Sequence, residues 1–325
     1  MWLSRCQVAP QHAALSASSG GPLQDSKDNQ NLSALELQSK GAVRHAVTSR
    51  KGLVPYNKNK VNQDRFVFKY ALGDDPGVSM WGVMDGHGEY GHYVAAFVQE
   101  NLPACLALEK NLRKSPEESI TRATAAMCKR LQETDINCSF SGSTLVFGVR
   151  IDDTLYVANV GDSRCVLCKQ GPNGQPIAIP LSTDQKPERA DEKARILAHG
   201  GRVEPLPGPP GECGPARVWL AEADVPGLAM SRSIGDEVSQ TVGVTSIPEI
   251  SKHVIANDDV FAVWASDGVW EFISDESAIK LLWKYKDNLQ EAANQLAEES
   301  TKQWRKEEEV IDDITLVLVQ FNPYK

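Results

Sequence analysis

The sequence has no long apolar run and no excess of positive charge. Nowhere in its 325 residues is there a stretch near the roughly 18 consecutive apolar residues that a membrane helix needs. The formal net charge is -9, and no block of lysine and arginine interrupts this acidic balance. Because proteins bind nucleic acids largely by neutralising phosphates, we expect neither a nucleic-acid partner nor a membrane-spanning segment.

Cysteine is sparse and irregular. The seven cysteines show no framework spacing, which is typical of a reducing compartment. Residues 1–6 lack the apolar core of a secretory signal, and Trp2 in place of glycine excludes N-myristoylation. We therefore expect a cytoplasmic or nuclear protein. Cys165 and Cys168 have CxxC spacing, but they lie in a strand-like run with no second CxxC, and we interpret them as packing residues.

Two parts of the chain differ in composition. Residues 1–40 are rich in small and amide side chains without periodicity, which predicts a flexible or loosely docked N-terminal segment. Residues 41–325 are predicted to form one domain in which strands group with strands and helices with helices. This grouping indicates the α+β class, with helices packed outside antiparallel sheets. The stretch 203–227, crowded with proline and glycine, is predicted to be a long irregular excursion with a functional or mobile role.

Apolar periodicity locates the elements of this domain. A capping box gives one helix a clear start, with Ser115 as N-cap, Pro116 at the first helical position and Glu118 two residues later. Period-2 patterns or short apolar runs predict strands, and period-3.6 patterns predict helices. The predicted strands are 64–70, 78–84, 145–149, 155–160, 260–266 and 314–321; the predicted helices begin near 90 or span 115–131, 188–198, 274–286 and 288–306.

Carboxylates stand at the ends of four predicted strands. Asp85 and Asp267 each end an apolar, tryptophan-containing run and precede a glycine, Asp64 opens a third strand, and Asp312 with Asp313 opens the last. Turn preference explains any one of these positions. Four converging carboxylates, however, would repel one another and raise their own pKa values, so together they predict a bound cation. An all-oxygen site without paired histidine or cysteine favours Mg²⁺ or Mn²⁺ over Zn²⁺.

Such a site predicts a class of chemistry. Two hard cations about 3.5–4 Å apart clamp the attacking and leaving oxygens of a phosphoryl displacement and lower the pKa of a bridging water. His87 follows Asp85 by two residues and is placed to give a proton to the leaving alkoxide. The glycine after Asp85 and the glycine after Asp267 allow the backbone to approach closely, so that a carbonyl can act as a further ligand. This pattern indicates a phosphatase that forms no covalent intermediate.

Nine segments in order carry a family resemblance. They resemble the metal-dependent protein phosphatase family (PPM, or protein phosphatase 2C, type) over about residues 41–322. The segments are VNQDRF (61–66), VMDGHGEYG (83–91), SGSTLVFGV (141–149), NVGDSR (159–164), DQKPE (184–188), GLAMSRSIGD (227–236), GVTSIPEI (243–250), ASDGVWEFIS (265–274) and DDITLVLV (312–319).

The resemblance implies a fold and an activity. The implied fold is a β-sandwich of two antiparallel sheets flanked by helices on both outer faces, in four layers, with a flap or insertion near 203–240. The implied activity is hydrolysis of phosphoserine and phosphothreonine in protein substrates, by direct attack of a metal-bridged water or hydroxide. The implied cofactors are two core Mg²⁺ or Mn²⁺ ions with a weaker third, and we expect a monomer.

The resemblance also implies roles for the aspartates. Asp85 would bridge the two metals, and the carbonyl of Gly86 would be a further ligand. Asp267 and Asp312 would bind the other sides of the metals, and Asp64 would contact water on a metal.

Further roles are implied outside this core set. His87 matches the candidate general acid of the family. Asp162, with Asp267 and the residue four positions later, Glu271, resembles the weaker third metal site, although that last position is more usually aspartate. The phosphate-binding arginine of the family lies upstream of the first motif, and Arg50 is our candidate for it.

Three positions qualify the comparison with the family. Gln63 stands where some members have glutamate, which predicts weaker ligation through water. Asp313 stands where others have asparagine, and we favour Asp312 as the metal ligand. Thr144 matches a threonine near the site. The stretch 231–233 is interpreted as structural support beside the flap.

Competing chemistries lack their motifs. No cysteine is followed by arginine six residues later, which disfavours a cysteinyl-phosphate mechanism. The sequence also has no Asp-x-Asp-x-Thr/Val motif, no Gly-Asn-His-Glu motif, no P-loop and no His-Glu-x-x-His. Two alternatives stay open. One is a pseudophosphatase that binds partners with weak or no turnover, and the other is a phosphohydrolase acting on small molecules.

Overall fold

Two five-stranded antiparallel sheets face each other in the computed structural model, which describes residues 43–206 and 214–321. The predicted N-terminal segment 1–40 lies outside the described residues. The first sheet has the order β1 (Arg44–Arg50), β16 (Ile314–Gln320), β15 (Asp259–Ala265), β8 (Arg164–Gln170) and β9 (Pro176–Pro180). The second has the order β14 (Glu249–Val254), β7 (Thr154–Val160), β6 (Leu145–Ile151), β3 (Val78–Met84) and β2 (Arg65–Tyr70).

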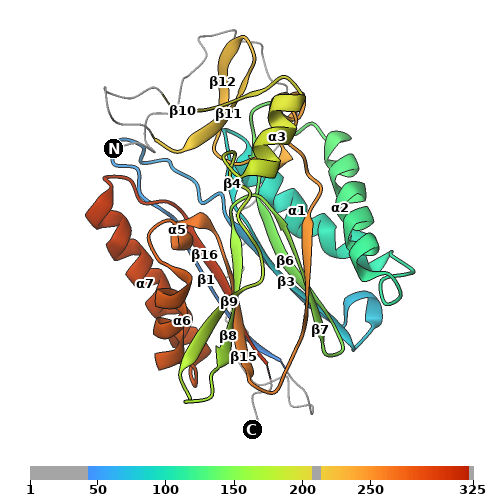
Figure 1. The fold of residues 1–325 in the computed structure, drawn as a ribbon, viewed down its shortest axis with the longest axis vertical. Helices are drawn as coiled ribbons and strands as arrows, with labels where there is room; N and C mark the ends of the chain where they lie inside the picture. The colour runs from blue at the N-terminus through green and yellow to red at the C-terminus, as the bar shows by residue number, and fades with distance from the viewer. Residues whose placement is uncertain (1–42, 207–213, 322–325) are drawn as a thin grey trace.

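Helices cover the outer face of each sheet (Figure 1). Helices α1 (Gly91–Ala107) and α2 (Pro116–Gln132) pack on the second sheet, and α6 (Asp275–Lys284) and α7 (Leu289–Glu307) pack on the first. The predicted α+β sandwich with helices on both outer faces is therefore confirmed. No helix of the described chain combines the length and apolarity that crossing a membrane requires.

Two buried tryptophans pack together at the centre of the sandwich. Trp81 of β3 and Trp264 of β15 are fully buried, with ring centroids 6.2 Å apart across the interface between the sheets. Each sheet is covered by helices on one face and by the other sheet on its second face. A strand in that position is buried on both sides, so its sequence is a nearly continuous apolar run instead of an alternating one. This accounts for the runs in β15 and β16, and Cys165 and Cys168 of β8 are buried free cysteines, as their interpretation as packing residues requires.

Helix ends follow the predicted signals with one exception. Helix α2 has Ser115 as its N-cap and proline in its first turn, but the Ser115 side chain makes no capping hydrogen bond, so the capping box was a wrong prediction. The backbone N–H of Ser119 reaches the Ser115 carbonyl instead (2.9 Å). Helix α3 (Ala190–Ala198) ends before Gly200, whose φ of 79° is the left-handed conformation that favours glycine.

The stretch predicted to be an irregular excursion contains a third sheet. Strands β10 (Arg202–Pro205), β11 (Ala216–Leu220) and β12 (Ala223–Leu228) form it, at the top of the molecule in Figure 1. The prediction of irregular structure is thus wrong for the described part of this stretch. The physical reason is a small apolar core of its own, in which Val203, Val218 and Leu228 pack with Ile196 of α3.

A fourth, very short sheet lies between the large ones and the β10–β12 sheet. It has the order β13 (Ile234–Gly235), β5 (Gly142–Ser143) and β4 (Gly86–His87), and α4 (Glu237–Gln240) follows β13. In its register, Gly142 lies opposite both His87 and Gly235. The sheet therefore brings the chain after Asp85 next to a segment almost 150 residues further on.

Candidate active site

The four predicted strand-end aspartates gather at one edge of the sandwich. Asp64 immediately precedes β2 and Asp85 immediately follows β3, and these antiparallel neighbours start and finish side by side in the second sheet. Asp267 follows β15 and Asp312 precedes β16 in the same way in the first sheet. The Ser266 hydroxyl of the first sheet donates to Asp64 Oδ2 of the second (2.8 Å), which ties the two edges together. We call Asp64, Asp85, Asp267 and Asp312 the four-aspartate cluster.

The pKa values of all four aspartates in the cluster are raised. Burial, followed by the charges of Asp313 and Asp312, raises the pKa of Asp64 to about 7. The pKa of Asp85 is raised well above its ordinary value by burial and then by Asp64, Asp267 and Asp312. Burial is again the largest cause for Asp267 and Asp312, whose pKa values are also raised. The charge of Asp312 raises the pKa values of the other three, which places the four carboxyl groups in one site.

Several carboxylate oxygens at this site have no partner. Among the described residues, Oδ1 of Asp64, Asp162 and Asp267 is buried without a hydrogen bond. A buried charged oxygen without a partner is costly, and native structures rarely leave one unexplained. The donor set consists of oxygen atoms only, which suits a hard divalent cation such as Mg²⁺ or Mn²⁺. The residues present therefore fit the metal site that the sequence predicts.

Close backbone approach explains why glycine follows two of the aspartates. A Cβ on Gly86 would lie 2.4 Å from the carbonyl oxygen of Gly91, and a Cβ on Gly268 would lie 1.9 Å from that of Asp313. No other residue fits at either position without a backbone shift. The repeated Asp-Gly pair is thus a packing requirement of the cluster, while metal ligation by the Gly86 carbonyl stays a prediction.

Thr144 fixes the backbone of Asp85. The Asp85 N–H donates to Thr144 Oγ1 (3.0 Å), and the Thr144 N–H donates to the Asp85 carbonyl (2.9 Å). The Thr144 hydroxyl also bonds the buried Ser163 hydroxyl (2.6 Å). This reciprocal pair holds Asp85 at the end of its strand and places Thr144 beside the site, where the family resemblance puts it.

The adjacent Asp312 and Asp313 have different surroundings. The Asp313 carboxylate accepts from the backbone N–H groups of Gly52 (2.7 Å) and Gln63 (2.8 Å) and pairs with Lys60 Nζ (2.6 Å). Asp313 is therefore occupied in holding the loop between β1 and β2. Asp312 has no such set of donors, which supports its assignment as the ligand.

The predicted third metal site is brought together only in part. Asp162 is buried near Asp267 and raises its pKa. Oδ2 of Asp162 pairs with Lys186 Nζ at 2.6 Å, a cation that the sequence reasoning did not assign to the site. Glu271 is exposed at the end of α5 (Asp267–Trp270), where its backbone N–H donates to the Asp267 carbonyl (2.8 Å), and no hydrogen bond in the described chain joins its carboxylate to Asp162 or Asp267. Its role as a ligand stays a prediction that this arrangement does not support.

Arg50 is not brought to the cluster. Its guanidinium lies 3.4 Å from the Asn294 carbonyl and 3.8 Å from Glu298 Oε1, both on α7. Thr48, two residues earlier on β1 and therefore on the same face, also contacts Asn294 (2.9 Å). That face of β1 packs against α7, which turns Arg50 away from the aspartates. The cations whose charges do act on the cluster are Lys60, on Asp312, and Lys186, on Asp267.

His87 lies on β4 with an acidic partner that sequence reasoning missed. Its Nε2 is 2.6 Å from Oδ2 of Asp236, while Nδ1 is buried without a partner among the described residues. Burial lowers the pKa of His87, but the charge and hydrogen bond of Asp236 outweigh it, so the net shift is upward. Asp236 ends GLAMSRSIGD (227–236), one of the nine segments that resemble the family. Its place in that segment was the sequence signal that could have identified it as a site residue.

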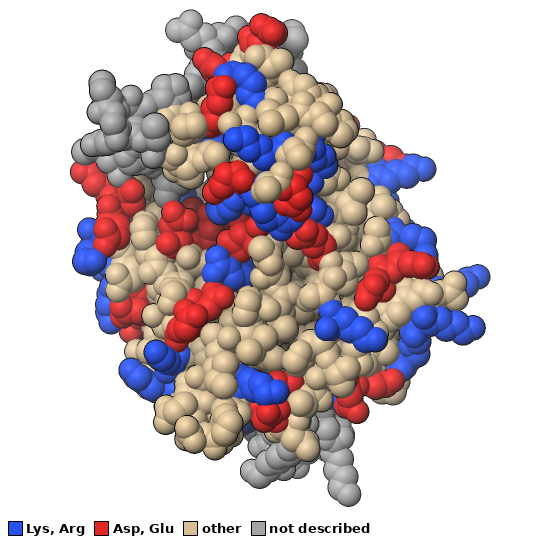
Figure 2. Space-filling model, viewed as in Figure 1, with Lys and Arg blue, Asp and Glu red and all other residues tan. Residues whose placement is uncertain are grey.

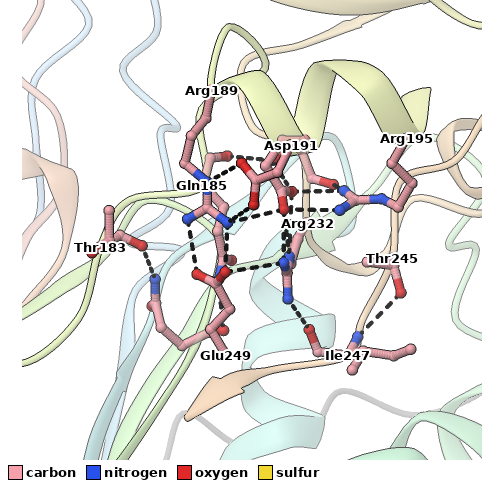
Figure 3. Close-up of polar contacts among 12 residues, drawn as sticks. Thr183, Gln185, Arg189, Asp191, Arg195, Arg232, Thr245, Ile247 and Glu249 are labelled. Carbon is pink, nitrogen blue, oxygen red and sulfur yellow. Dashed lines mark hydrogen bonds and ion pairs between the residues drawn. The ribbon is translucent and has the colours of Figure 1, made fainter. Parts of the chain in front are cut away.

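Figure 3 shows a second group of carboxylates, in which Asp191 and Glu249 lie among arginine side chains. Oxygens of Asp191, Glu192 and Glu249 lie within 4.8 Å of one another, a spacing that alone would suit a metal ion. Guanidinium groups already occupy them, however. The buried Glu192 accepts from Arg195 (2.6 Å) and Arg232 (2.7 Å), and its pKa is lowered because these bonds outweigh its burial.

We call these residues and Arg189 the Glu192 network. Arg189 pairs with both Asp191 (2.8 Å) and Glu192 (3.1 Å) and with Glu249. Figure 2 shows the same balance at the surface, where acidic and basic side chains interleave below the β10–β12 sheet. The network joins α3 to β14 and to the backbone of residues 231–247, in keeping with the interpretation of 231–233, and because its carboxylates are paired with guanidinium groups it is not a metal site.

Comparison with known proteins agrees with this site. The family model described as "Protein phosphatase 2C" matches residues 57–308. The chain is 34% identical over 323 residues to "Probable protein phosphatase 2C 35" of Arabidopsis thaliana, with 93% of this chain and 92% of that relative covered. It is 36% identical over 270 residues to "Probable protein phosphatase 2C 72" of the same plant, with 79% and 80% covered.

The fold has solved counterparts. The crystal structure of serine-threonine phosphatase 2C from Toxoplasma gondii matches with a TM-score of 0.75 at 20% identity, over 87% of this chain and 96% of that one. At that identity the match shows a common fold alone. The family match spans well over half of the sequence and includes Asp64, Asp85 and Asp267, so this chain belongs to the protein phosphatase 2C family of metal-dependent serine/threonine protein phosphatases.

Proposed function

We propose that this chain hydrolyses phosphoserine and phosphothreonine in protein substrates at the four-aspartate cluster, with Mg²⁺ or Mn²⁺ as cofactor. The observation that carries the proposal is the gathering of four buried or half-buried carboxyl groups whose pKa values are all raised, with Oδ1 of Asp64 and of Asp267 left without a partner among the described residues. Such a site is relieved by divalent cations, and two cations side by side are a known device for phosphoryl transfer.

Each aspartate has a proposed part in holding the metal. Asp85 lies between the two sheet edges and interacts with Asp64, Asp267 and Asp312, so it is the candidate bridging ligand. Asp267 and Asp312 would bind from the first sheet, and Asp64 from the second. When bound, the cations would lower the pKa of an attacking water and offset charge on the phosphoryl oxygens.

His87 is the proposed general acid. The alkoxide of serine or threonine is a poor leaving group and needs a proton as its bond to phosphorus breaks. Nε2 of His87 is engaged by Asp236, so we assign the proton transfer to Nδ1, which is buried without a partner among the described residues. Arg50 has no part in this proposal, because its guanidinium contacts α7.

The proposal is tested by metal-dependent turnover. Purified protein stripped with EDTA should not hydrolyse a phosphothreonine peptide, and added Mn²⁺ or Mg²⁺ should restore hydrolysis. Turnover that persists in EDTA, or an Asp85→Ala variant of undiminished rate, would contradict the proposal. Tight phosphopeptide binding without turnover in Mn²⁺ would instead favour the pseudophosphatase alternative.

A second test addresses the acid role. The His87→Ala variant should lose about 10²-fold or more in kcat for a phosphothreonine peptide, the range expected of a missing general acid. For p-nitrophenyl phosphate, whose leaving group needs no proton, the loss should be far smaller. Equal losses for the two substrates would rule out proton donation by His87.

A further inference from the structure

The partner of His87 is held with unusual firmness. The Asp236 carboxylate is almost fully buried, and its Oδ2 accepts from His87 Nε2 and from Ser233 Oγ, each at 2.6 Å. The Asp236 backbone N–H donates to the Ser141 carbonyl (3.0 Å). Both the side chain and the main chain of Asp236 are therefore fixed by neighbouring strands.

The Asp236 carboxylate packs closely against the backbone of Gly142. A Cβ on Gly142 would lie 2.2 Å from Asp236 Oδ2 and 2.6 Å from Ser233 Oγ, so the carboxylate passes directly over a bare glycine. Asp236 itself has a φ of 50°, in the left-handed region that residues other than glycine seldom adopt. Backbone strain of this kind persists only where the surrounding structure imposes it, and it clusters at functional sites.

Asp236 fixes which ring nitrogen faces the reaction. A carboxylate is an acceptor only, so Nε2 of His87 must carry a proton toward it. The partner of one imidazole nitrogen sets the orientation and the role of the other. With Nε2 held by Asp236, Nδ1 is the ring nitrogen that is buried without a partner in the described chain.

We propose that Asp236 is a positioning residue that holds the His87 imidazole so that Nδ1 delivers its proton to the leaving oxygen. The inference rests on the proposed function, because it assumes that His87 is the general acid. In the step, the bond from phosphorus to the seryl or threonyl oxygen breaks as the Nδ1 proton passes to that oxygen. The imidazole is left neutral, with its one remaining proton on Nε2 in the hydrogen bond to the Asp236 carboxylate, and solvent returns a proton to Nδ1.

The chain contains a matched control pair. His253 Nε2 lies 2.7 Å from Oδ2 of Asp259, and the side chains of this pair are exposed to 24% and 0%, against 24% and 3% for His87 and Asp236. His253 is on β14, and neither residue interacts with the four-aspartate cluster. Asp259→Asn therefore removes a His–Asp contact of the same geometry without touching the proposed site.

The experiment measures kcat with Mn²⁺ for a phosphothreonine peptide and for p-nitrophenyl phosphate. Asp236→Asn should lower kcat for the peptide at least tenfold and that for p-nitrophenyl phosphate less than threefold, whereas Asp259→Asn should change the ratio of the two rates by less than twofold. The double variant Asp236→Asn with His87→Ala should be no slower on the peptide than His87→Ala alone, because both changes remove the same proton transfer.

Three results would overturn the inference. They are equal losses on both substrates in Asp236→Asn, a ratio changed as much by Asp259→Asn, and additive losses in the double variant. If His87→Ala loses activity selectively and Asp236→Asn does not, the inference fails while the proposed function stands; if His87→Ala shows no selectivity, the acid role and the inference fail together.

A milder variant keeps the test open if Asp236→Asn does not fold. Ser233→Ala removes one donor to the Asp236 carboxylate, and it should lower kcat for the peptide two- to fivefold with a smaller effect on p-nitrophenyl phosphate. In the folded wild-type protein, nitrogen NMR of His87 should show a proton on Nε2 at every pH at which the protein is folded. An Nε2 without a proton would overturn the inference directly.

Discussion

The four-aspartate cluster and the Glu192 network are two groups of buried carboxylates with opposite electrostatics. Glu192 is surrounded by guanidinium groups, and its pKa is lowered even though it is fully buried. In the cluster the neighbours are other carboxylates, and the pKa values of all four members are raised. Carboxylates thus form stabilising ion pairs in the Glu192 network, whereas those of the four-aspartate cluster are suited to bind a cation.

The partners explain this difference. Arginine gives planar, bidentate hydrogen bonds that satisfy carboxylate oxygens within the protein. The cluster has only Lys60 and Lys186 at its margins, and each is paired with an aspartate outside the four. Oxygens of Asp64 and Asp267 consequently have no protein partner in the described chain. Variants that remove one charge from each region should therefore behave differently.

The largest effect is expected for Asp85→Asn. This change removes the candidate bridging ligand, and phosphopeptide hydrolysis should fall roughly 10³-fold, equivalent to about 4 kcal/mol of transition-state stabilisation. The melting temperature without metal should not fall, because a repelled charge has been removed. Steady-state kinetics in Mn²⁺ and thermal denaturation in EDTA measure the two quantities. A rate within tenfold of wild type would show that the four-aspartate cluster does not need Asp85 for hydrolysis.

Glu192→Gln should have the reverse profile. Removing the acidic partner leaves several buried or half-buried guanidinium groups without compensation, which should lower the free energy of unfolding by about 3 kcal/mol. Asp191→Asn is the matched control. Its side chain is 63% exposed and also contacts Arg189, so its loss should cost less than about 1 kcal/mol. Urea denaturation measures both, and similar values for the two variants would contradict the role given to burial.

The adjacent residues Asp312 and Asp313 provide the same contrast between a proposed metal ligand and a structural carboxylate. Asp313→Asn disturbs a carboxylate that accepts from two backbone N–H groups and pairs with Lys60, so it should lower stability by about 1–2 kcal/mol. Asp312→Asn should leave the stability of the metal-free protein unchanged and weaken Mn²⁺ binding. Paired measurements of denaturation and Mn²⁺ affinity separate the two. The reverse assignment would show that Asp313 is the ligand.

A fourth prediction concerns the pH dependence of stability. The pKa of Asp64 is about 7 in the folded protein and near 4 in the unfolded chain, so the folded state binds the extra proton between these values. Stability from this group is therefore complete below about pH 4 and is lost as pH rises through about 7. In EDTA, Asp64→Asn should melt at the wild-type temperature near pH 4 and progressively above it toward pH 8. Parallel melting curves across this range would show that Asp64 is not perturbed.

Strand-end aspartates could be predicted from sequence because both of their signals are local. An apolar run marks each strand, and an acidic residue marks where it starts or ends. Antiparallel pairing then places Asp64 beside Asp85 and Asp267 beside Asp312, so the core of the site was within reach of sequence reasoning. The sandwich architecture was predictable for the same reason, because strands and helices form separate groups along the chain.

Features that depend on tertiary register could not be predicted in this way. Strand β1 has a polar sequence, and only its pairing with β16 determines that Arg50 faces α7. Asp236 meets His87 through a sheet whose strands have two residues each, far too short to leave a periodic pattern. The strands β10–β12 were hidden by the prolines and glycines of their segment. In each case a contact distant in sequence decided the outcome.

Direct titration of Mn²⁺ into EDTA-stripped protein by calorimetry tests the central claim most directly, because it measures the cluster without depending on a substrate. We expect about two tightly bound ions per chain at pH 7.5 for wild type and for Glu192→Gln. In Asp85→Asn, at least one of these ions should be lost. Binding that is unchanged in Asp85→Asn but abolished in Glu192→Gln would place the metal in the Glu192 network and contradict the account.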